Sequence, residues 1–325
     1  MNKSITKSQL LNIVLIVMLV IVAGFGYLYY KKTNIVTAIN QVVPTVSDTP
    51  QQPDYLFSIY GSDNDFFDHP RSITVWDSKI YVADTLHGRV MVFDYNGKYL
   101  QTIGGRGKFA GAMRMPSEIA VFNNQLYVTD YELGKIGIYT LNGNFIGYFA
   151  EKVFKSPLNI KVAGDKFYVL DSLPQKIYIL DPKGNILKSF GNQGGKQGEL
   201  YFADGINVDK DGNIYVADSN NFRIQVFTPD GKAKAVWKSD KKDNSDGYTV
   251  PRGIAFDQKG YIYTANGLAG GVTVSDSSGK RLALFTQGES RDDTLTLPNS
   301  VFIDENNKLY ITEYGRSRIL VYQIK

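Results

Sequence analysis

Acidic side chains in this sequence are followed five positions later by basic side chains, and this arrangement occurs five times. Such a pair could transfer protons in catalysis, or it could join two neighbouring strands as an ion pair. A catalytic centre needs one group of residues at one place, so five copies predict a structural role. The pairs are Asp84 and Arg89, Asp130 and Lys135, Asp171 and Lys176, Asp218 and Arg223, and Glu313 and Arg318.

The elements that must position these pairs form an internal repeat. The acid or its equivalent falls at positions 84, 130, 171, 218, 266 and 313, so the spacing is 41 to 48 residues. Each unit contains four short strand-forming stretches, strands a to d, and a glycine turn precedes strand d. Units of this length and content predict the blades of an all-β, six-bladed propeller. A second marker, at the start of strand a, keeps the same period: Pro70, Pro116, Pro157, Ala203, Pro251 and Pro298.

The ends of the repeat region complement each other. The sixth unit stops after strand c and lacks a strand d. Residues 55–61, YLFSIYG, match strand d of the first unit, residues 99–105, YLQTIGG. We therefore expect the N-terminal strand to complete the last blade and to cover its open edge.

The units resemble NHL repeats, in which a proline-started strand leads into a Tyr-Val-x-Asp stretch, a short loop, an Arg-Ile-x-Val-Phe stretch and a glycine turn. Residues 190–231, FGNQGGKQGELYFADGINVDKDGNIYVADSNNFRIQVFTPDG, are close to this pattern throughout. The resemblance covers all six units and implies a six-bladed propeller of the NHL or TolB-like kind. It does not imply one activity, because NHL propellers include enzymes, RNA binders, receptor sensor domains and protein-binding platforms.

Residues 10–30 are uncharged and, apart from Asn12, contain no strongly polar side chain; Lys7 precedes them and Lys31 follows them. A helix of this length can cross a bilayer, and the run exceeds the apolar region of a cleaved secretory signal, which is the alternative. The flanking lysines favour a single-pass membrane protein with the propeller outside the cytoplasm. The expected domains are a short tail at 1–9, a transmembrane signal anchor at 10–30, a polar, proline-containing linker at 31–53 and the propeller at 54–325.

The charge distribution argues against a nucleic acid as partner. The chain has a formal net charge of +4, and its first 32 residues contribute four lysines and no acids. The remainder has 32 basic and 32 acidic residues, so it lacks the basic excess that phosphate binding requires. The sequence also contains no cysteine, which excludes disulfides, thiolate catalysis and cysteine-ligated metal sites.

Polar residues at the start of strand a differ from unit to unit. Strand a is the innermost strand of a propeller blade, so its start lies at the mouth of the central channel. A structural position is similar in all repeats, whereas dissimilar polar residues suit recognition of an asymmetric ligand. We call these six residues the mouth ring: Arg71, Glu118, Asn159, Asp204, Arg252 and Asn299.

Unit five departs from the pattern, because Asn266 and Gly271 replace the acid and the base around the sequence NGLAGG. It is either a cleft where a partner approaches the backbone or a degenerate blade.

Two histidines, His69 and His87, belong to the first unit. The NHL-like amidating lyases build their zinc site from histidines on different blades. Two histidines in one blade cannot form such a site, so we expect His69 and His87 to be ordinary loop residues. Three acidic turns are candidate calcium sites: residues 62–68, 209–213 and 243–247. No other metal and no cofactor is predicted.

Two functions stay open. The preferred one is a membrane-anchored, extracytoplasmic propeller that binds a protein or peptide, or acts as a scaffold, through its mouth ring. The alternative is a metal-dependent hydrolase, similar to six-bladed lactonases that bind calcium or zinc with Glu, Asn and Asp from several blades. Two arginines in the mouth ring oppose a bound cation. The sequence also lacks a Ser-His-Asp order, a phosphate-binding glycine loop and an HExxH motif, which favours binding over catalysis.

Overall fold

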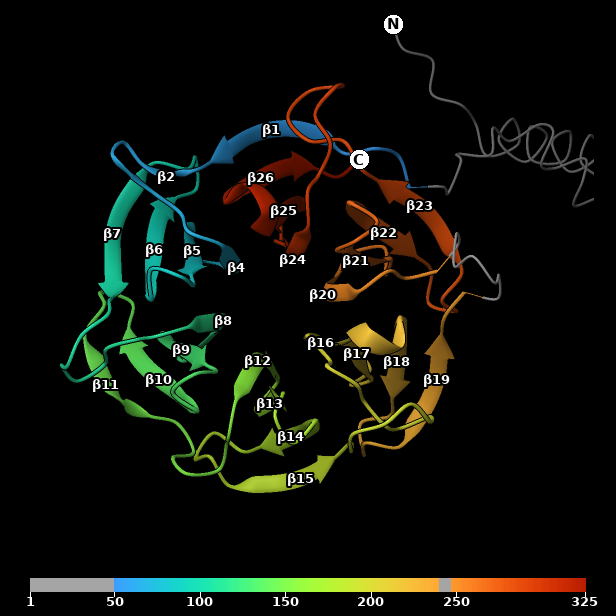
Figure 1. The fold of residues 1–325 in the computed structure, drawn as a ribbon, viewed down its shortest axis with the longest axis horizontal. Coiled ribbons are helices and arrows are strands. Elements are labelled where there is room, and N and C mark those ends of the chain that lie inside the picture. Colours follow the sequence, from blue (N-terminus) through green and yellow to red (C-terminus); the bar gives the residue numbers. More distant parts are fainter. Residues whose placement is uncertain (1–49, 240–246) are drawn as a thin grey trace, which may run out of the picture. The chain divides into compact units, whose positions relative to one another are not determined.

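Six four-stranded antiparallel sheets form a ring around a central channel in the computed structural model, which describes residues 50–239 and 247–325 (Figure 1). In each sheet the strand nearest the channel is the one that we labelled a, and strand d lies at the periphery. The six-bladed propeller predicted from the repeat is confirmed.

The first three blades follow the chain from the inside outwards. Blade one comprises β4 (Pro70–Trp76), β5 (Lys79–Asp84), β6 (Arg89–Asp94) and β7 (Tyr99–Gly104). Blade two comprises β8 (Pro116–Phe122), β9 (Gln125–Asp130), β10 (Lys135–Thr140) and β11 (Phe145–Tyr148). Blade three comprises β12 (Pro157–Ala163), β13 (Lys166–Asp171), β14 (Lys176–Leu180) and β15 (Ile186–Phe190).

Blades four and five continue in the same way, and blade six takes one strand from each end of the propeller sequence. Blade four comprises β16 (Gly205–Val208), β17 (Ile214–Asp218), β18 (Arg223–Phe227) and β19 (Ala233–Trp237). Blade five comprises β20 (Pro251–Phe256), β21 (Ile262–Asn266), β22 (Gly271–Ser275) and β23 (Arg281–Phe285). Blade six comprises β24 (Pro298–Ile303), β25 (Lys308–Glu313), β26 (Arg318–Gln323) and β1 (Asp54–Ile59).

The N-terminal strand closes the ring as the sequence predicted. β1 pairs antiparallel with β26, with Asp54 opposite Gln323 and Ile59 opposite Ile319. The side chain of Lys325 adds an ion pair to Asp54, with Nζ and Oδ1 2.8 Å apart. The last blade therefore has four strands, and β1 covers the edge of β26.

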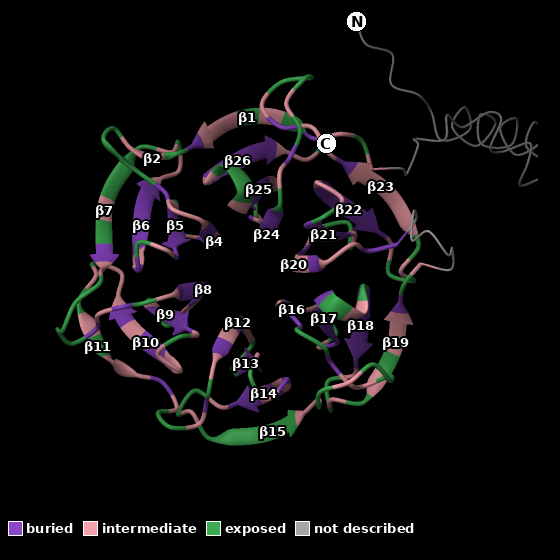
Figure 2. Cartoon of the chain, in the orientation of Figure 1, coloured by how far each residue is buried: buried purple, intermediate pink, exposed green. Residues whose placement is uncertain are grey.

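The hydrophobic core lies between neighbouring blades (Figure 2). Strands b and c are buried along most of their length, whereas strands d are half-buried or exposed. Each strand b contributes one tyrosine to this core, and all six tyrosines are buried because their rings fill the space between two sheets. They are Tyr81, Tyr127, Tyr168, Tyr215, Tyr263 and Tyr310.

Three details go beyond the sequence prediction. A small hairpin of β2 (Gly61–Ser62) and β3 (Asp65–Phe66) precedes blade one. The innermost strand of blade four begins at Gly205, two positions after the marker residue Ala203. Two single-turn 3₁₀ helices occupy b–c loops: η1 (Ser219–Asn221) and η2 (Tyr314–Arg316).

Membrane attachment is not shown by the part of the chain that the structure describes. Among these residues no helix is long and apolar enough to cross a bilayer. The expected tail at 1–9, the expected transmembrane helix at 10–30 and all but the last residues of the expected linker lie outside the described residues.

Candidate functional site

The acid at the end of strand b fastens the backbone that leads into strand a. In every blade its side-chain oxygen accepts a hydrogen bond from a main-chain N–H one or two positions before the strand-a marker. Because the donor needs only an acceptor oxygen, the amide of Asn266 can do the same in blade five. The N···O distances are 2.7 Å from Asp68 to Asp84, 2.6 Å from Arg114 to Asp130, 2.7 Å from Ser156 to Asp171, 2.7 Å from Tyr201 to Asp218, 2.7 Å from Thr249 to Asn266 and 2.5 Å from Thr296 to Glu313.

Three arginines complete the ion pairs proposed from the sequence. Arg89 Nε lies 2.7 Å from Asp84, Arg223 Nε lies 2.7 Å from Asp218, and Arg318 Nε donates to Glu313. The remaining guanidinium nitrogens are used as well, since those of Arg223 donate to the carbonyls of residues 195, 196 and 199. These arginines thus tie strand c to the preceding d–a loop.

The two lysine pairs proposed from the sequence are not formed. No ion pair joins Lys135 to Asp130 or Lys176 to Asp171, although all four residues are described. Lys135 instead places its ammonium 4.0 Å from the centre of the Tyr148 ring and 3.6 Å from Glu151. A lysine carries one ammonium on a flexible stem and cannot reproduce the branched geometry of arginine. The acid is therefore the constant structural element of the pair.

Four members of the mouth ring meet across the channel. Arg71 on β4 and Asp204 before β16 belong to opposite blades, and they form an ion pair. Arg252 on β20 lies 3.0 Å from the second oxygen of Asp204, and it donates to Asn299 Oδ1 at 2.5 Å. Asn299 Nδ2 in turn donates to the carbonyl oxygen of Arg71 at 2.8 Å. The chain of contacts links blades one, four, five and six.

The other two members, Glu118 on β8 and Asn159 on β12, form a second group. Asn159 Nδ2 donates to Glu118 Oε2 at 2.7 Å. Glu118 Oε1 accepts from the Ser72 hydroxyl at 2.8 Å and from Lys161 Nζ at 3.0 Å. Sequence reasoning missed Ser72 and Lys161, although they stand one and two positions beyond ring positions in their own units.

These contacts plug the channel. The cavity between the two groups measures about 10 Å³, which is roughly the space of one water molecule. The buried Asn159 Oδ1 atom has no hydrogen-bond partner and lines this cavity, so such a water would satisfy it. The space between the two groups therefore has no room for a ligand larger than a water molecule.

A shallow pocket of about 330 Å³ opens above the plug. Arg71, Arg252 and Asp204 contribute to its lining, so two guanidinium groups share one carboxylate there. Burial raises the pKa of Tyr131 in the pocket wall, while the Arg71 guanidinium, 5.8 Å from its ring centre, acts in the opposite direction. Tyr131 therefore stays neutral and can donate a hydrogen bond.

Exposed apolar side chains stand on the b–c and d–a loops of the same face. Leu268, in the NGLAGG stretch of blade five, is 67% exposed, and Leu173 in the equivalent loop of blade three is 68% exposed. Phe202 and Leu297 precede strands a with positive φ values of 47° and 51°, a region that large side chains rarely adopt. We call these residues the apolar rim: Leu173, Phe202, Phe222, Leu268 and Leu297.

The candidate metal residues are occupied by protein contacts. His69 Nδ1 lies 2.5 Å from Asp68, and His87 Nδ1 lies 2.9 Å from Asp84. Asp65, within residues 62–68, is bound by Arg89. In residues 209–213 the Asp209 carboxylate closes its own turn, and residues 243–246 lie outside the described part. Among the described residues no three His, Asp or Glu side chains gather in a way that could hold a metal ion.

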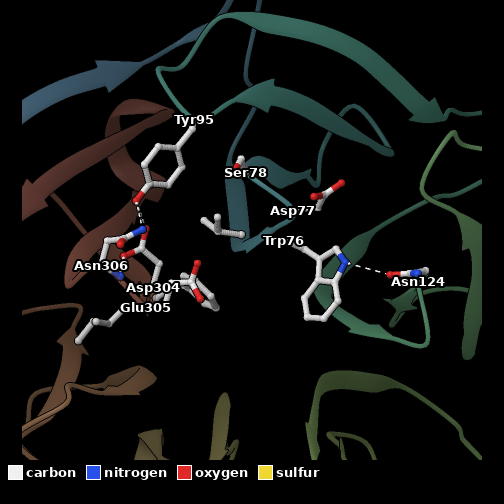
Figure 3. A pocket seen from close by; sticks show the side chains of 11 residues that line it. Trp76, Asp77, Ser78, Tyr95, Asn124, Asp304, Glu305 and Asn306 are labelled. Atoms are coloured by element: carbon white, nitrogen blue, oxygen red, sulfur yellow. Dashed lines mark hydrogen bonds between the residues drawn. The ribbon is translucent and has the colours of Figure 1, made fainter.

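A second pocket, of about 610 Å³, lies at the other end of the channel, where the strands a of blades six and one end (Figure 3). Figure 3 shows Trp76 on one side of it and Tyr95, Asp304 and Asn306 on the other. The Tyr95 hydroxyl donates to Asp304 at 2.6 Å, and the Trp76 indole N–H donates to Asn124 at 3.3 Å. Burial, together with Asp304, raises the pKa of Tyr95, so its hydroxyl stays protonated.

Comparison with known sequences agrees with the repeat architecture. A family model described as a six-bladed β-propeller matches residues 61–150, and an NHL repeat model matches residues 200–227. The E3 ubiquitin-protein ligases TRIM71 of Rattus norvegicus and Bos taurus are each 37% identical over 81 residues, which is 25% of this chain and 8% of the relative. The matched segment is thus a small part of these relatives.

Comparison with solved structures shows the fold alone, because sequence identities are low. A gluconolactonase from Xanthomonas campestris superposes with a TM-score of 0.63 at 17% identity, covering 87% of this chain and 99% of that one. A catalytically inactive virginiamycin B lyase from Staphylococcus aureus, with quinupristin, gives a TM-score of 0.59 at 16% identity, covering 83% and 88%. Both likenesses extend over most of the propeller.

Proposed function

We propose that this propeller is a binding module that recognises a protein or peptide on its channel-mouth face. The observation that carries the proposal is the cross-channel network of Arg71, Asp204 and Arg252, which fixes polar groups in a pocket that Phe202 of the apolar rim also lines. Protein interfaces concentrate their binding energy in a few central residues, and arginine and aromatic side chains are enriched among them. The NHL repeats, shared over 81 residues with ubiquitin-protein ligases, support a role in contacting proteins.

The mouth arrangement favours binding over metal-dependent hydrolysis. Glu118, Asn159 and Asp204 supply the residue types that a lactonase-like metal site requires. Lys161 neutralises Glu118, however, and two arginines neutralise Asp204, so a cation placed there would meet positive charge on both sides. The structural likeness to a gluconolactonase keeps hydrolysis as the alternative function.

We further propose that the module is anchored in a membrane through residues 10–30, with the propeller outside the cytoplasm and no nucleic acid as partner. The support is the uncharged apolar run and the formal neutrality of the remaining sequence. Protease digestion of intact cells tests the orientation, because an external propeller should be cut without lysis.

Site-specific photo-crosslinking in the cells of origin tests the binding surface. A photo-reactive residue at Phe222, on the apolar rim, should capture a defined partner, whereas the same residue at Ile186 on the outer strand β15 should not. Substitution of Arg252 by alanine should weaken capture at position 222, because it removes half of the guanidinium pair. Capture at position 186 with none at 222 would refute the assignment of the mouth.

Thermal unfolding with added metal ions tests the alternative. The binding function predicts the same melting temperature with and without calcium or zinc. A rise that is specific for one metal, and that Glu118→Ala or Asp204→Ala abolishes, would establish a metal site and favour the hydrolase.

A further inference from the structure

We propose that the pocket at the end of the channel opposite the mouth binds an organic cation: an alkylammonium or guanidinium group. Its walls come from three neighbouring blades, with Trp76 from blade one, Asn124 from blade two and Asp304 from blade six (Figure 3). At about 610 Å³ it is large enough for a small ligand or an extended side chain. It lies away from the mouth ring, so the inference does not depend on the proposed function.

The first observation is the indole of Trp76, which is 43% exposed at the end of β4. Its N–H is already bound to Asn124 Oδ1 at 3.3 Å, so the polar edge of the ring is satisfied and its orientation is fixed. What the side chain offers a ligand is its π surface. An aromatic face of this kind attracts cations through its quadrupole, and tryptophan does so most strongly.

The second observation is the charge of the lining. Asp77, Asp304 and Glu305 contribute three carboxylates, and no lysine or arginine is among the described lining residues. Asp304 is buried and engaged by the hydroxyls of Tyr95 and Tyr310. Asp77 and Glu305 are exposed, and neither forms an ion pair with a described residue, so these two remain available to a positively charged ligand.

The chain itself supplies a third observation. The ammonium of Lys308, which is not itself a lining residue, lies 3.6 Å from the centre of the ring of Tyr95, which lines the pocket. An ammonium already packs on one aromatic wall, while the Trp76 wall opposite has no such partner among the described residues. With Lys308 counted, the pocket still has an excess of two negative charges.

A pocket between blades four and five, on the same end face, provides the internal comparison. It has a similar volume of about 590 Å³ and carries Asp209, Asp211 and Asp257. Lys210 and Lys259 also line it, and tryptophan does not. Comparing the two pockets therefore distinguishes two causes of cation binding. One is specific recognition by the aromatic ring and the unpaired carboxylates, and the other is general attraction to an acidic surface.

Titration calorimetry of the full-length protein with spermidine at low ionic strength tests the proposal. We expect saturable binding that Trp76→Leu weakens about 5-fold, because an exposed cation–π contact has that strength. The double variant Asp77→Asn with Glu305→Gln should weaken binding by a similar factor, since two exposed charge pairs are lost. All three residues are exposed, so these variants should unfold at the wild-type temperature.

Asp211→Asn is the matched control, because it removes one carboxylate from the same face but from the other pocket. It should leave spermidine affinity unchanged. An absence of saturable binding, or an equal loss in Asp211→Asn and Trp76→Leu, would overturn the proposal. Trilysine as a second probe identifies the source of the cation: competition with spermidine assigns a basic peptide side chain, and its absence assigns a free polyamine.

Discussion

Replacing the strand-b acid by asparagine should have very different consequences in blades three and four. In blade four, Asp218 accepts the Tyr201 N–H on one oxygen and the side chains of Asn221, Arg223 and Gln225 on the other. An asparagine would turn its own N–H₂ group toward these three donors and leave the buried guanidinium of Arg223 without a counter-charge. Breaking a buried ion pair from one side costs about 3–5 kcal/mol, so we expect Asp218→Asn to lose about 4 kcal/mol.

In blade three the same substitution should be mild. Asp171 has no basic partner and accepts the main-chain N–H groups of Lys155 at 2.9 Å and Ser156 at 2.7 Å. Asparagine would keep one of these bonds and lose the other, a cost of about 1–3 kcal/mol. It would also remove a buried carboxylate whose burial is itself unfavourable. The net loss should be about 1 kcal/mol.

Urea unfolding of the full-length protein at pH 7, followed by tryptophan fluorescence, measures both effects. The expected difference of about 3 kcal/mol corresponds to roughly 6–12 °C in melting temperature. The reciprocal change, Asn266→Asp, should be destabilising, because it buries a carboxylate where Gly271 supplies no base. Equal losses of unfolding free energy in Asp171→Asn and Asp218→Asn, or a larger loss in Asp171→Asn, would refute this reasoning. The arginine contact would then not be what makes the acid of blade four more important for stability than the acid of blade three.

The pH dependence gives the same pair an independent check. Burial raises the pKa of Asp171 above its ordinary value of 3.8, against the backbone N–H groups that lower it. The native state then binds this proton more readily than the unfolded chain does. Stability contributed by Asp171 falls as the pH rises from 3.8 through the raised pKa. Asp171→Asn should lack this fall, so its stability deficit relative to the wild type should shrink with rising pH in that window.

Three further predictions follow from other contacts. Gly205→Ala should destabilise the propeller by more than about 2 kcal/mol, since the added methyl would overlap the backbone carbonyl of Arg252, whereas Gly147→Ala, in open space, should be tolerated. Arg89 lowers the pKa of Asp65, so the stability from this contact is present above 3.8 and is lost as the pH falls through the lowered pKa; Asp65→Asn should remove that acid-side loss in urea titrations. Deleting β1 should lower the melting temperature and promote association, because the edge of β26 is uncovered.

Each of these has a clear contrary result. Gly147→Ala as harmful as Gly205→Ala would mean that steric overlap is not the cause. An unchanged acid titration in Asp65→Asn would show that the Arg89 contact does not contribute to stability. A monomeric β1 deletion with the wild-type melting temperature would mean that β1 does not seal the ring.

The architecture was predictable because it depends on a period that the sequence repeats six times. Two markers with the same spacing defined the blades, and the match between residues 55–61 and 99–105 gave the closure. The apolar pattern of each strand reports which face of the strand is buried, and this pattern, repeated with the period, is enough to identify a propeller. The repeat also indicated that the residues of the mouth ring would gather around one channel.

The contacts within the site were harder to derive. Spacing alone treated Lys176 and Arg223 as equivalent, but only the branched guanidinium reaches both the acid and the neighbouring loop carbonyls. The contact between Arg71 and Asp204 joins residues that are 133 positions apart in the sequence, on opposite blades. Which side chains meet there depends on their lengths across a narrow channel. The pocket at Trp76 forms where strands a end, whereas the mouth ring marks where they begin. The residues at these ends also differ between units, so their divergence is the sequence signal for this pocket.

The pairing of β1 with β26 also constrains how the protein can be made. Synthesis proceeds from the N-terminus, so β1 is made more than 250 residues before its partner at Arg318–Gln323 exists. During this interval the YLFSI stretch has strand-forming residues and no native neighbour, which is the condition under which an edge pairs with the wrong chain. The ring can therefore close only after β26 has been synthesised, and folding of the sixth blade should depend on factors that shield the first strand until then.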